Sequence, residues 1–487
     1  MIIIRYDLII RGGKLLVPSI GIIEGDIGIR EGKIAAIGKS LDPNQADKAI
    51  DAHNLLVTPG IIDAHFHIGI YRPPREDALS ESRSAIIGGI TTLISYFRTG
   101  RYYLNTSGPY LKIFPELLKT VDGAFYTDYS FHLAPILLTH LDEMEILVKE
   151  YGVTSFKFWR IYSGTTLRGE YRRGRMEEEF LFSDTPYDLG HLYEIMLRAS
   201  KLREYGVRVS IHAEEPELIR RFLGVMKDAL NRGEVKPLEA YHLARPPESE
   251  VIAIAEAMYI AKFTNCPINV LHISSSLAFE EALRLRDILS IDAALEVTLH
   301  HLSLTIDSPA QVRAKVNPPI RTKDDVEKLW EFVRKGKVDL FGSDSAALTS
   351  NMKDRGLWDA EAGFAGAGLF LPILYTEGFL KRDIPLETLL VPATIKPAKV
   401  FGLWPKKGNL GIGADADIVI FDPNIEKIVK PEILESGQDF TPWEGMTLRG
   451  WPVYVLVRGN IVMEKGIIID KPAGKYIKRP VDKWGKA

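Results

Sequence analysis

Apolar runs alternate with amphipathic stretches through the middle of the chain. The runs are short and rich in β-branched and aromatic residues, a pattern typical of strands buried on both faces. Eight runs of this kind are predicted strands: Ile61–Phe66, Thr91–Phe97, His132–Leu137, Val153–Phe158, Val207–Ile211, Ile268–Ile273, Ala293–Thr298 and Val338–Phe341.

The stretches between these runs carry apolar residues at three- and four-residue spacings and charges on the opposite face, which predicts helices. The clearest are Leu189–Tyr205, Glu248–Phe263, Leu277–Leu289 and Asp324–Lys335. Eight strands alternating with helices predict an α/β fold, a parallel (β/α)8 TIM barrel, whose strand-end loops build the active site. An open, doubly wound sheet is the structural alternative, but no Gly-x-Gly-x-x-Gly follows the first strand.

The two ends of the chain differ from this middle, because short strands bounded by glycines replace the alternation. The strand-like segments are Asp7–Ile10, Asp26–Arg30, Lys33–Ile37, Ala416–Phe421 and Val453–Arg458. We therefore expect a small β-sandwich domain built from both termini, residues 1–57 and 403–487, around a barrel domain of residues 58–402.

Composition limits the expected partners and the expected compartment of the protein. The 487 residues are 46% hydrophobic and carry a net charge of −3, so neither nucleic acid nor a membrane surface is an expected partner. Cys266 is the single cysteine, which favours a reducing compartment. The N-terminus resembles neither a signal peptide nor a membrane span. These features predict a cytoplasmic protein.

Candidate chemistry gathers where the predicted strands end. His65 and His67 alternate along the first strand, so both side chains share one face and can close on one ion. Further ligand-type residues lie on or just after four other strands: Lys157, His212, His272 and Asp344. One strand histidine is more often a hydrogen-bonded core residue, but six such residues at one rim of a barrel predict a metal site. The remaining histidines have a structural or surface role by default: His53, His132, His140, His191, His242, His300 and His301.

Lys157 is the most informative single residue among these candidates. Phe156, Phe158 and Trp159 flank it, and burying a free ammonium among aromatic rings is unfavourable. The side chain either extends to the surface at the strand end or is modified so that it supplies an acid group.

Ten stretches spread over nearly the whole chain carry a resemblance to a known family. They are Thr58–His67, Gly88–Thr92, Ser155–Lys157, His212–Glu214, Arg245–Pro247, His272–Ser275, Asn317–Arg321, Gly342–Asp344, Pro397–Gly402 and Asp415–Val419. Through them the chain resembles a cyclic amidohydrolase of the amidohydrolase superfamily, in the group of hydantoinases, dihydropyrimidinases, allantoinases and dihydroorotases.

The resemblance implies a binuclear metal centre. Lys157 would be carboxylated by carbon dioxide and would bridge two divalent ions, usually zinc. One ion would take His65, His67 and Asp344, and the other His212 and His272. Two such ions can share a hydroxide and polarise a substrate carbonyl.

The implied reaction is hydrolytic opening of a cyclic amide or imide, a small molecule, as in a hydantoinase or dihydropyrimidinase. Asp344 would accept the hydroxide proton and pass it to the leaving nitrogen. Tyr162, five residues after Lys157, would donate to the developing oxyanion, and Asn317 would lie in a substrate-facing loop. The family also implies a homo-oligomer, a tetramer or a dimer.

Two departures from the family pattern and two alternative functions bear on this interpretation. Many relatives carry His after the strand-eight Asp, where this chain has Ser345. Dihydroorotases place Arg at the position of Gly69, and Arg72 is out of register, so an allantoinase is a better alternative than a dihydroorotase. A one-metal deaminase would use His212 with Glu215 as proton shuttle, but such enzymes lack the bridging lysine. A non-catalytic assembly protein is disfavoured because all six ligand positions are kept.

Overall fold

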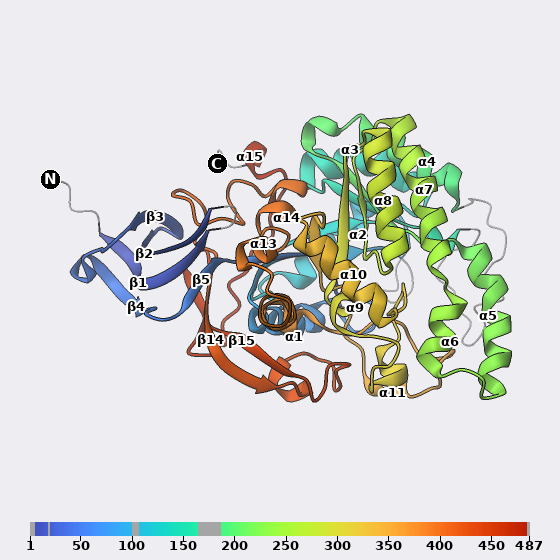
Figure 1. Ribbon diagram of the computed structural model, residues 1–487. Helices are drawn as coiled ribbons and strands as arrows, with labels where there is room; N and C mark the ends of the chain where they lie inside the picture. The colour runs from blue at the N-terminus through green and yellow to red at the C-terminus, as the bar shows by residue number, and fades with distance from the viewer. Residues whose placement is uncertain (1–4, 18–19, 100–106, 164–186, 485–487) are drawn as a thin grey trace.

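A computed structural model describes residues 5–17, 20–99, 107–163 and 187–484 (Figure 1). Its centre is a parallel sheet in which eight strands pair in chain order. The strands are β6 (Ile61–His67), β7 (Ile90–Phe97), β8 (Asp128–Leu133), β9 (Ser155–Trp159), β10 (Arg208–His212), β11 (Ile268–Val270), β12 (Ala293–Thr298) and β13 (Leu340–Gly342). A parallel bridge between Phe66 and Ser345 brings the last strand region back to the first, so the sheet is nearly closed into a barrel.

The prediction of eight barrel strands is therefore confirmed, with shifts of one or two residues at several strand ends and two larger corrections. The third strand spans Asp128–Leu133 rather than His132–Leu137, because its first half carries buried polar side chains that an apolar pattern does not reveal and Pro135 beyond it has no N–H to donate. The sixth strand ends at Val270, since the backbone at His272 turns to a φ of 35° and leaves the extended region.

Helices cover the outside of the barrel (Figure 1). The longer ones are α1 (Pro74–Ile87), α2 (Tyr110–Val121), α3 (Leu138–Tyr151), α4 (Leu189–Ser200), α5 (Pro216–Asn231), α6 (Pro237–Ala244), α7 (Pro247–Thr264), α8 (Ser276–Leu289) and α10 (Lys323–Arg334). Shorter ones are α9 (Leu299–Ser303), α11 (Ser350–Lys353), α12 (Phe370–Ile373), α13 (Leu386–Leu390), α14 (Ile395–Val400) and α15 (Val481–Trp484). The four predicted helices correspond to α4, α7, α8 and α10. The first ends earlier than expected, at Ser200.

Both chain ends contribute to a second, mixed sheet of nine strands. They are β1 (Tyr6–Val17), β2 (Gly21–Arg30), β3 (Lys33–Gly38), β4 (Ala46–Asp51), β5 (Leu56–Pro59), β14 (Ile418–Ile428), β15 (Thr447–Val457), β16 (Asn460–Glu464) and β17 (Ile467–Ile468). The strand β5 joins the two ends, because it pairs parallel with β1 and antiparallel with β14. The region expected as a sandwich is thus hydrogen-bonded as one sheet. The domain limits 1–57, 58–402 and 403–487 stay a prediction.

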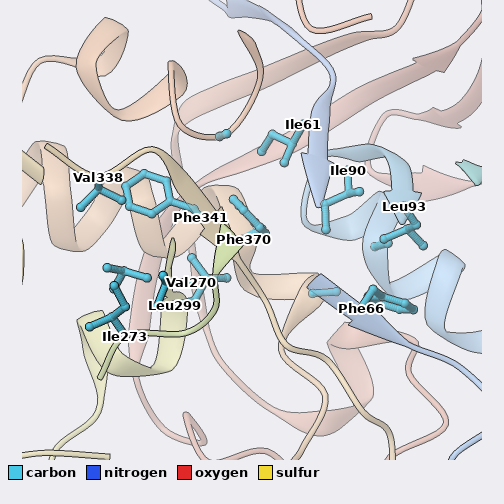
Figure 2. Packing of buried hydrophobic residues seen from close by; sticks show 14 of the residues in the cluster. Ile61, Phe66, Ile90, Leu93, Val270, Ile273, Leu299, Val338, Phe341 and Phe370 are labelled. Carbon is cyan, nitrogen blue, oxygen red and sulfur yellow. The ribbon is translucent and has the colours of Figure 1, made fainter. Parts of the chain in front are cut away.

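The main apolar core lies around the barrel strands. Figure 2 shows part of it, with Ile61, Phe66 and Leu93 from one side of the barrel and Val270 and Phe341 from the other. Full burial of one such side chain contributes about 1.5–3 kcal/mol, so this core fixes the strands that carry the candidate ligands. Among the helices of the described residues, none is both long and apolar enough to span a bilayer.

Buried charge closes the amino-terminal end of the barrel, which we call the floor. The Lys407 Nζ lies 2.7 Å from Asp128, 2.5 Å from Asp417 and 3.4 Å from Asp415. Asp128 begins β8, and Asp417 directly precedes β14, so this ammonium joins the barrel to the mixed sheet. Arg458 adds a second ion pair to Asp128.

Candidate metal centre and active site

The carboxyl ends of the barrel strands form the opposite end, the mouth, where His65 and His67 close β6. Both side chains are buried, and their alternation places them on one face. The Nε2 atoms lie 3.0 Å and 3.2 Å from the same Oδ1 atom of Asp344, which follows β13. The first and last strands of the barrel therefore deliver three of the predicted ligands to one point.

Asp63 fixes the geometry of this seam. Its carboxylate accepts hydrogen bonds from the Ser343 hydroxyl at 2.5 Å, from the Ser343 N–H at 3.2 Å and from the His65 N–H at 3.1 Å. Burial raises the pKa of Asp63 to about 7, although these donors act in the opposite direction. The backbone of Asp344 has a φ of 47°, a conformation unfavourable for a residue with a Cβ, and the contacts of Asp63 offset that cost.

Lys157 points into the same space from β9. Its side chain is buried, and Nζ lies 3.3 Å from the His65 Nε2 atom and 4.0 Å from the centre of the Tyr96 ring. Within the described residues, no carboxylate lies within ion-pair distance of this amine. Burial lowers the pKa of Lys157 to about 8, although Asp344 and Glu296 oppose the shift. More of this amine is therefore neutral near pH 7 than of an ordinary lysine.

The two remaining imidazoles face each other. The His212 Nδ1 atom, at the end of β10, lies 2.9 Å from the His272 Nε2 atom, just past β11. Burial lowers the pKa of both side chains, so both are neutral and available as ligands at neutral pH. The mouth thus brings together all six predicted metal ligands.

Glu296, which the sequence did not single out, orients two of these residues. Its Oε1 atom lies 2.5 Å from the His65 Nδ1 atom and accepts the His272 N–H at 3.1 Å. Burial lowers the pKa of His65, but Asp344 and Glu296 outweigh it and raise the value to about 9. A carboxylate behind a ligand histidine is the usual support of a metal site. The one feature of the sequence that could have indicated Glu296 is the presence of an acidic residue inside the apolar strand β12.

The spacing of the donor atoms fits metal binding. Ligands of one tetrahedral Zn²⁺, bound at about 2.0–2.1 Å, lie roughly 3.3 Å from one another. The contacts of Asp344 with His65 and His67, and of Lys157 with His65, are 3.0, 3.2 and 3.3 Å. His65, His272 and Asp344 also form a group whose ligand atoms all lie within 4.8 Å. Imidazole and carboxylate are the donors that a divalent transition metal prefers.

The two predicted substrate-contacting residues lie at the same end of the barrel. Tyr162 ends the short helical turn Arg160–Tyr162 after β9, is 37% exposed, and has its ring 6.3 Å from that of Trp159. Asn317 is half-buried, and its Oδ1 accepts a 2.5 Å hydrogen bond from the Tyr241 hydroxyl. Their assigned roles remain predictions.

The departures from the family pattern have structural explanations. Ser345 completes the barrel, because its carbonyl accepts the His67 N–H at 2.9 Å and its hydroxyl accepts the Gly366 N–H at 3.2 Å. Arg72 is ion-paired with Asp77 at 3.3 Å and with Glu81 at 3.6 Å on the helix that follows. Its charge is thus neutralised within the protein.

Two other groups of residues have structural roles. Glu215 accepts the N–H groups of Glu217 and Leu218 and so caps α5, which leaves the proton-shuttle role of the deaminase alternative without support. The default assignment of the other histidines agrees with three buried examples that bond backbone carbonyls: His140, His191 and His301.

A nearly closed parallel barrel whose mouth gathers four imidazoles, an amine and a carboxylate is the arrangement of a metal-dependent barrel enzyme. The amidohydrolase family model matches residues 182–462, and the model of the urease alpha-subunit N-terminal domain matches residues 4–61.

Curated relatives and solved structures agree with the family matches. The D-hydantoinase of Geobacillus stearothermophilus is 32% identical, over 97% of this chain and 96% of its own length. The allantoinase of Rubrobacter xylanophilus is 30% identical, over 97% of this chain and 98% of its own length. A crystal structure of D-hydantoinase superimposes with a TM-score of 0.83 at 30% identity, over 97% of this chain and 98% of that one. The chain therefore belongs to the amidohydrolase superfamily, as a cyclic amidohydrolase: a metal-dependent hydrolase of cyclic amides.

Proposed function

We propose that the protein opens hydantoin or dihydropyrimidine rings by hydrolysis of a ring C–N bond. Two zinc ions would be held by His65, His67 and Asp344 on one side and by His212 and His272 on the other, with carboxylated Lys157 between them. The convergence of these six side chains at the barrel mouth, with donor atoms 2.9–3.3 Å apart, carries the proposal. When bound, two such metal ions activate water at neutral pH and polarise the amide carbonyl.

The environment of Lys157 supports its carboxylation. The neutral amine forms an N–C bond to carbon dioxide and releases one proton, which leaves a carbamate anion in place of a cation. Burial lowers the pKa of Lys157 to about 8 and so supplies the neutral amine. A carbamate would also offer two oxygen donors to the metal centre, whereas an amine has one donor atom.

Asp344 is the proposed proton carrier of the reaction. Its Oδ1 lies 3.0 and 3.2 Å from the Nε2 atoms of His65 and His67, where it would accept a proton from an attacking water. The carboxylate takes the proton of that water and returns it to the ring nitrogen when the C–N bond breaks. Tyr162 donates to the oxygen of the former carbonyl, and Asn317 positions the ring.

The choice of substrate rests on the relatives and on Arg72. Two relatives described above are a D-hydantoinase and an allantoinase, both of which cover nearly the whole chain. Dihydroorotate carries a carboxylate that needs a cationic partner, and Arg72 is already paired with Asp77 and Glu81. Hydantoins and dihydropyrimidines therefore come first, and allantoin is the second candidate.

We also propose that the protein is a cytoplasmic homo-oligomer, a tetramer or a dimer. The outer faces of α7 and α8 support association, because large apolar side chains are exposed there: Ile252, Tyr259, Phe263 and Ile288. The single thiol, Cys266, is buried, which agrees with a reducing compartment.

A turnover screen of the zinc-loaded protein tests the function. The substrates are hydantoin, dihydrouracil, allantoin, dihydroorotate and an open-chain amide, with Lys157→Ala run beside the wild type. We expect ring opening of hydantoin or dihydrouracil by the wild type, and loss of both zinc ions and of activity in Lys157→Ala. A variant that keeps two ions and full activity would contradict the role of Lys157. Turnover of allantoin alone would move the assignment to the second candidate.

A further inference from the structure

Two buried arginine–glutamate pairs lie directly behind the histidines of β10 and β11. The first joins Arg245 to Glu214 through two hydrogen bonds, from Nε at 2.9 Å and from a terminal nitrogen at 2.7 Å. The second joins Arg321 to Glu250 at 2.8 Å. All four side chains are at most 3% exposed. Burial of two ion pairs is costly, so their presence needs a reason other than stability.

The first pair determines which nitrogen of His212 faces the mouth. The Oε2 of Glu214 lies 2.7 Å from the His212 Nε2 atom. Because both Glu214 oxygens accept hydrogen bonds from Arg245, the carboxylate is held in place to accept the Nε2–H of His212. The Nδ1 lone pair of His212 is then directed towards His272.

The second pair holds the segment that carries His272. Glu250 accepts the N–H of Ser274 at 2.9 Å and its hydroxyl at 2.6 Å, and the same hydroxyl accepts from Arg321 at 2.8 Å. Ser274 lies two residues beyond His272, whose φ of 35° is unfavourable for a residue with a Cβ. The clamp on Ser274 keeps the backbone in that conformation.

A further hydrogen bond unites the two pairs. The guanidinium of Arg321 donates to the carbonyl of Arg245 at 2.6 Å. The Arg245 guanidinium also lies 5.5 Å from the centre of the Tyr241 ring, whose hydroxyl bonds Asn317. Among the described residues, His65 and Asp344 have no such arginine behind them: Glu296 accepts from His65, as well as from the His272 N–H, and Asp63 holds Ser343 next to Asp344.

We propose that Arg245, through Glu214, and Arg321, through Glu250 and Ser274, are positioning residues for His212 and His272. They prepare one ion site of the pair and leave the site of His65, His67 and Asp344 unaffected. This inference rests on the proposed binuclear centre. It predicts that the two zinc sites can be weakened separately.

Zinc binding by Arg245→Met tests the inference. Methionine keeps much of the side-chain length but removes the fork that holds Glu214. We expect one of the two zinc ions to bind about 10–100-fold more weakly and the other to bind as in the wild type. The readout is zinc per chain, measured by elemental analysis after dialysis against chelator-buffered zinc at a series of free concentrations.

Arg208→Met is the matched control. Arg208 begins the strand that His212 ends, and it is a buried arginine that bonds the Ile268 carbonyl at 2.5 Å and Asp292 at 2.8 Å. A general weakening of the barrel would affect zinc binding equally in both variants. The inference requires that Arg208→Met keep both ions at wild-type affinity.

Arg245→Lys keeps the charge without the bidentate fork, and we expect it to weaken the same single site by a smaller factor. If Arg245→Met does not fold, the Arg245→Lys titration decides. If both Arg245 variants bind two zinc ions as tightly as the wild type does, this inference alone is overturned. Equal loss of both ions would also overturn it. Fewer than two ions in the wild type would overturn the proposed function and the inference together.

Discussion

The mouth and the floor of the barrel each hold a compact group of ligand-type side chains. Among the described residues, His65, His272 and Asp344 at the mouth, and Asp128, Asp415 and Asp417 at the floor, have ligand atoms within 4.8 Å of one another. By composition the floor, with three carboxylates, is the stronger candidate for a cation. The difference lies in what already occupies each group.

At the floor, the protein supplies its own cation. Lys407 contacts all three carboxylates, and the remaining acceptors take the backbone N–H groups of Lys475 and Arg458 at 2.9 Å and 2.8 Å. Lys407 and Arg458 thus place two cations of the chain among these carboxylates, so the group is a structural junction.

The mouth is arranged differently. Lys157 lies beside an imidazole rather than a carboxylate, and two residues of the group, His272 and Asp344, have positive φ values. Strained backbone that neighbouring contacts hold in place is typical of functional sites. Ligand-type residues alone therefore do not define a metal site. Donor atoms that converge on backbone held in an unfavourable conformation do.

The largest expected effect concerns the mouth. Asp344→Asn keeps the side-chain volume but removes the negative charge and the basic oxygen, so we expect kcat to fall by about 10²–10⁴-fold at saturating zinc. Steady-state turnover of the best substrate from the screen measures the effect. Asp292→Asn, which changes an exposed carboxylate paired with Arg208, is the control. An Asp344→Asn variant within tenfold of the wild type would show that another group carries the proton.

The floor is the second test, and here the expected effect is on stability. Lys407→Met leaves three carboxylates, two of them fully buried, without their ammonium, and we expect a loss of about 3–5 kcal/mol in the free energy of unfolding. Urea unfolding measures this loss. Zinc content and kcat of the folded variant should stay at wild-type values.

Lys396→Met is the matched control for this change, because Lys396 forms a partly exposed ion pair with Asp339 that is worth about 0–1 kcal/mol. If Lys407→Met instead gained a tightly bound third ion without loss of stability, the floor would be a metal site that Lys407 blocks. The contrast between the two ends of the barrel would then fail.

Much of the fold could be predicted from the sequence, because buried parallel strands produce continuous apolar runs. The misplaced strand shows the limit of this signal. In β8, Asp128 and Ser130 are buried polar residues whose partners, Lys407 and Arg479, come about 280 and 350 positions later. A local pattern contains no trace of such partners, so the predicted strand begins only at His132.

The candidate site likewise has one part that the sequence reveals and another part that it does not. The six ligand-type residues could be found because each lies at a strand end and a barrel brings these ends together. Glu296 and Arg245 could not be assigned, although both lie in segments that were noted. A glutamate 231 positions from His65 gives no sign in the sequence that it will contact that ring.

The smallest expected effect concerns a buried imidazole that is not a ligand. The Nδ1 of His140 accepts the N–H groups of Ile136 and Leu137, both at 3.1 Å, and Nε2 donates to the Gly108 carbonyl at 2.8 Å. Protonation of Nδ1 would set an N–H against two other donors. Burial, in addition, lowers the pKa of His140 from 6.5 to about 4.

Because the folded pKa lies below the unfolded one, the contribution of His140 to stability is complete above 6.5 and is lost as the pH falls through about 4. The steepest loss is about 1.4 kcal/mol per pH unit. His140→Gln should lower stability at neutral pH but flatten the dependence on pH between these limits, with zinc content unchanged. Urea unfolding across this window measures both effects, and the exposed His53→Gln serves as control. Parallel stability curves for His140→Gln and the wild type would show that His140 is protonated as readily in the folded chain as in the unfolded one.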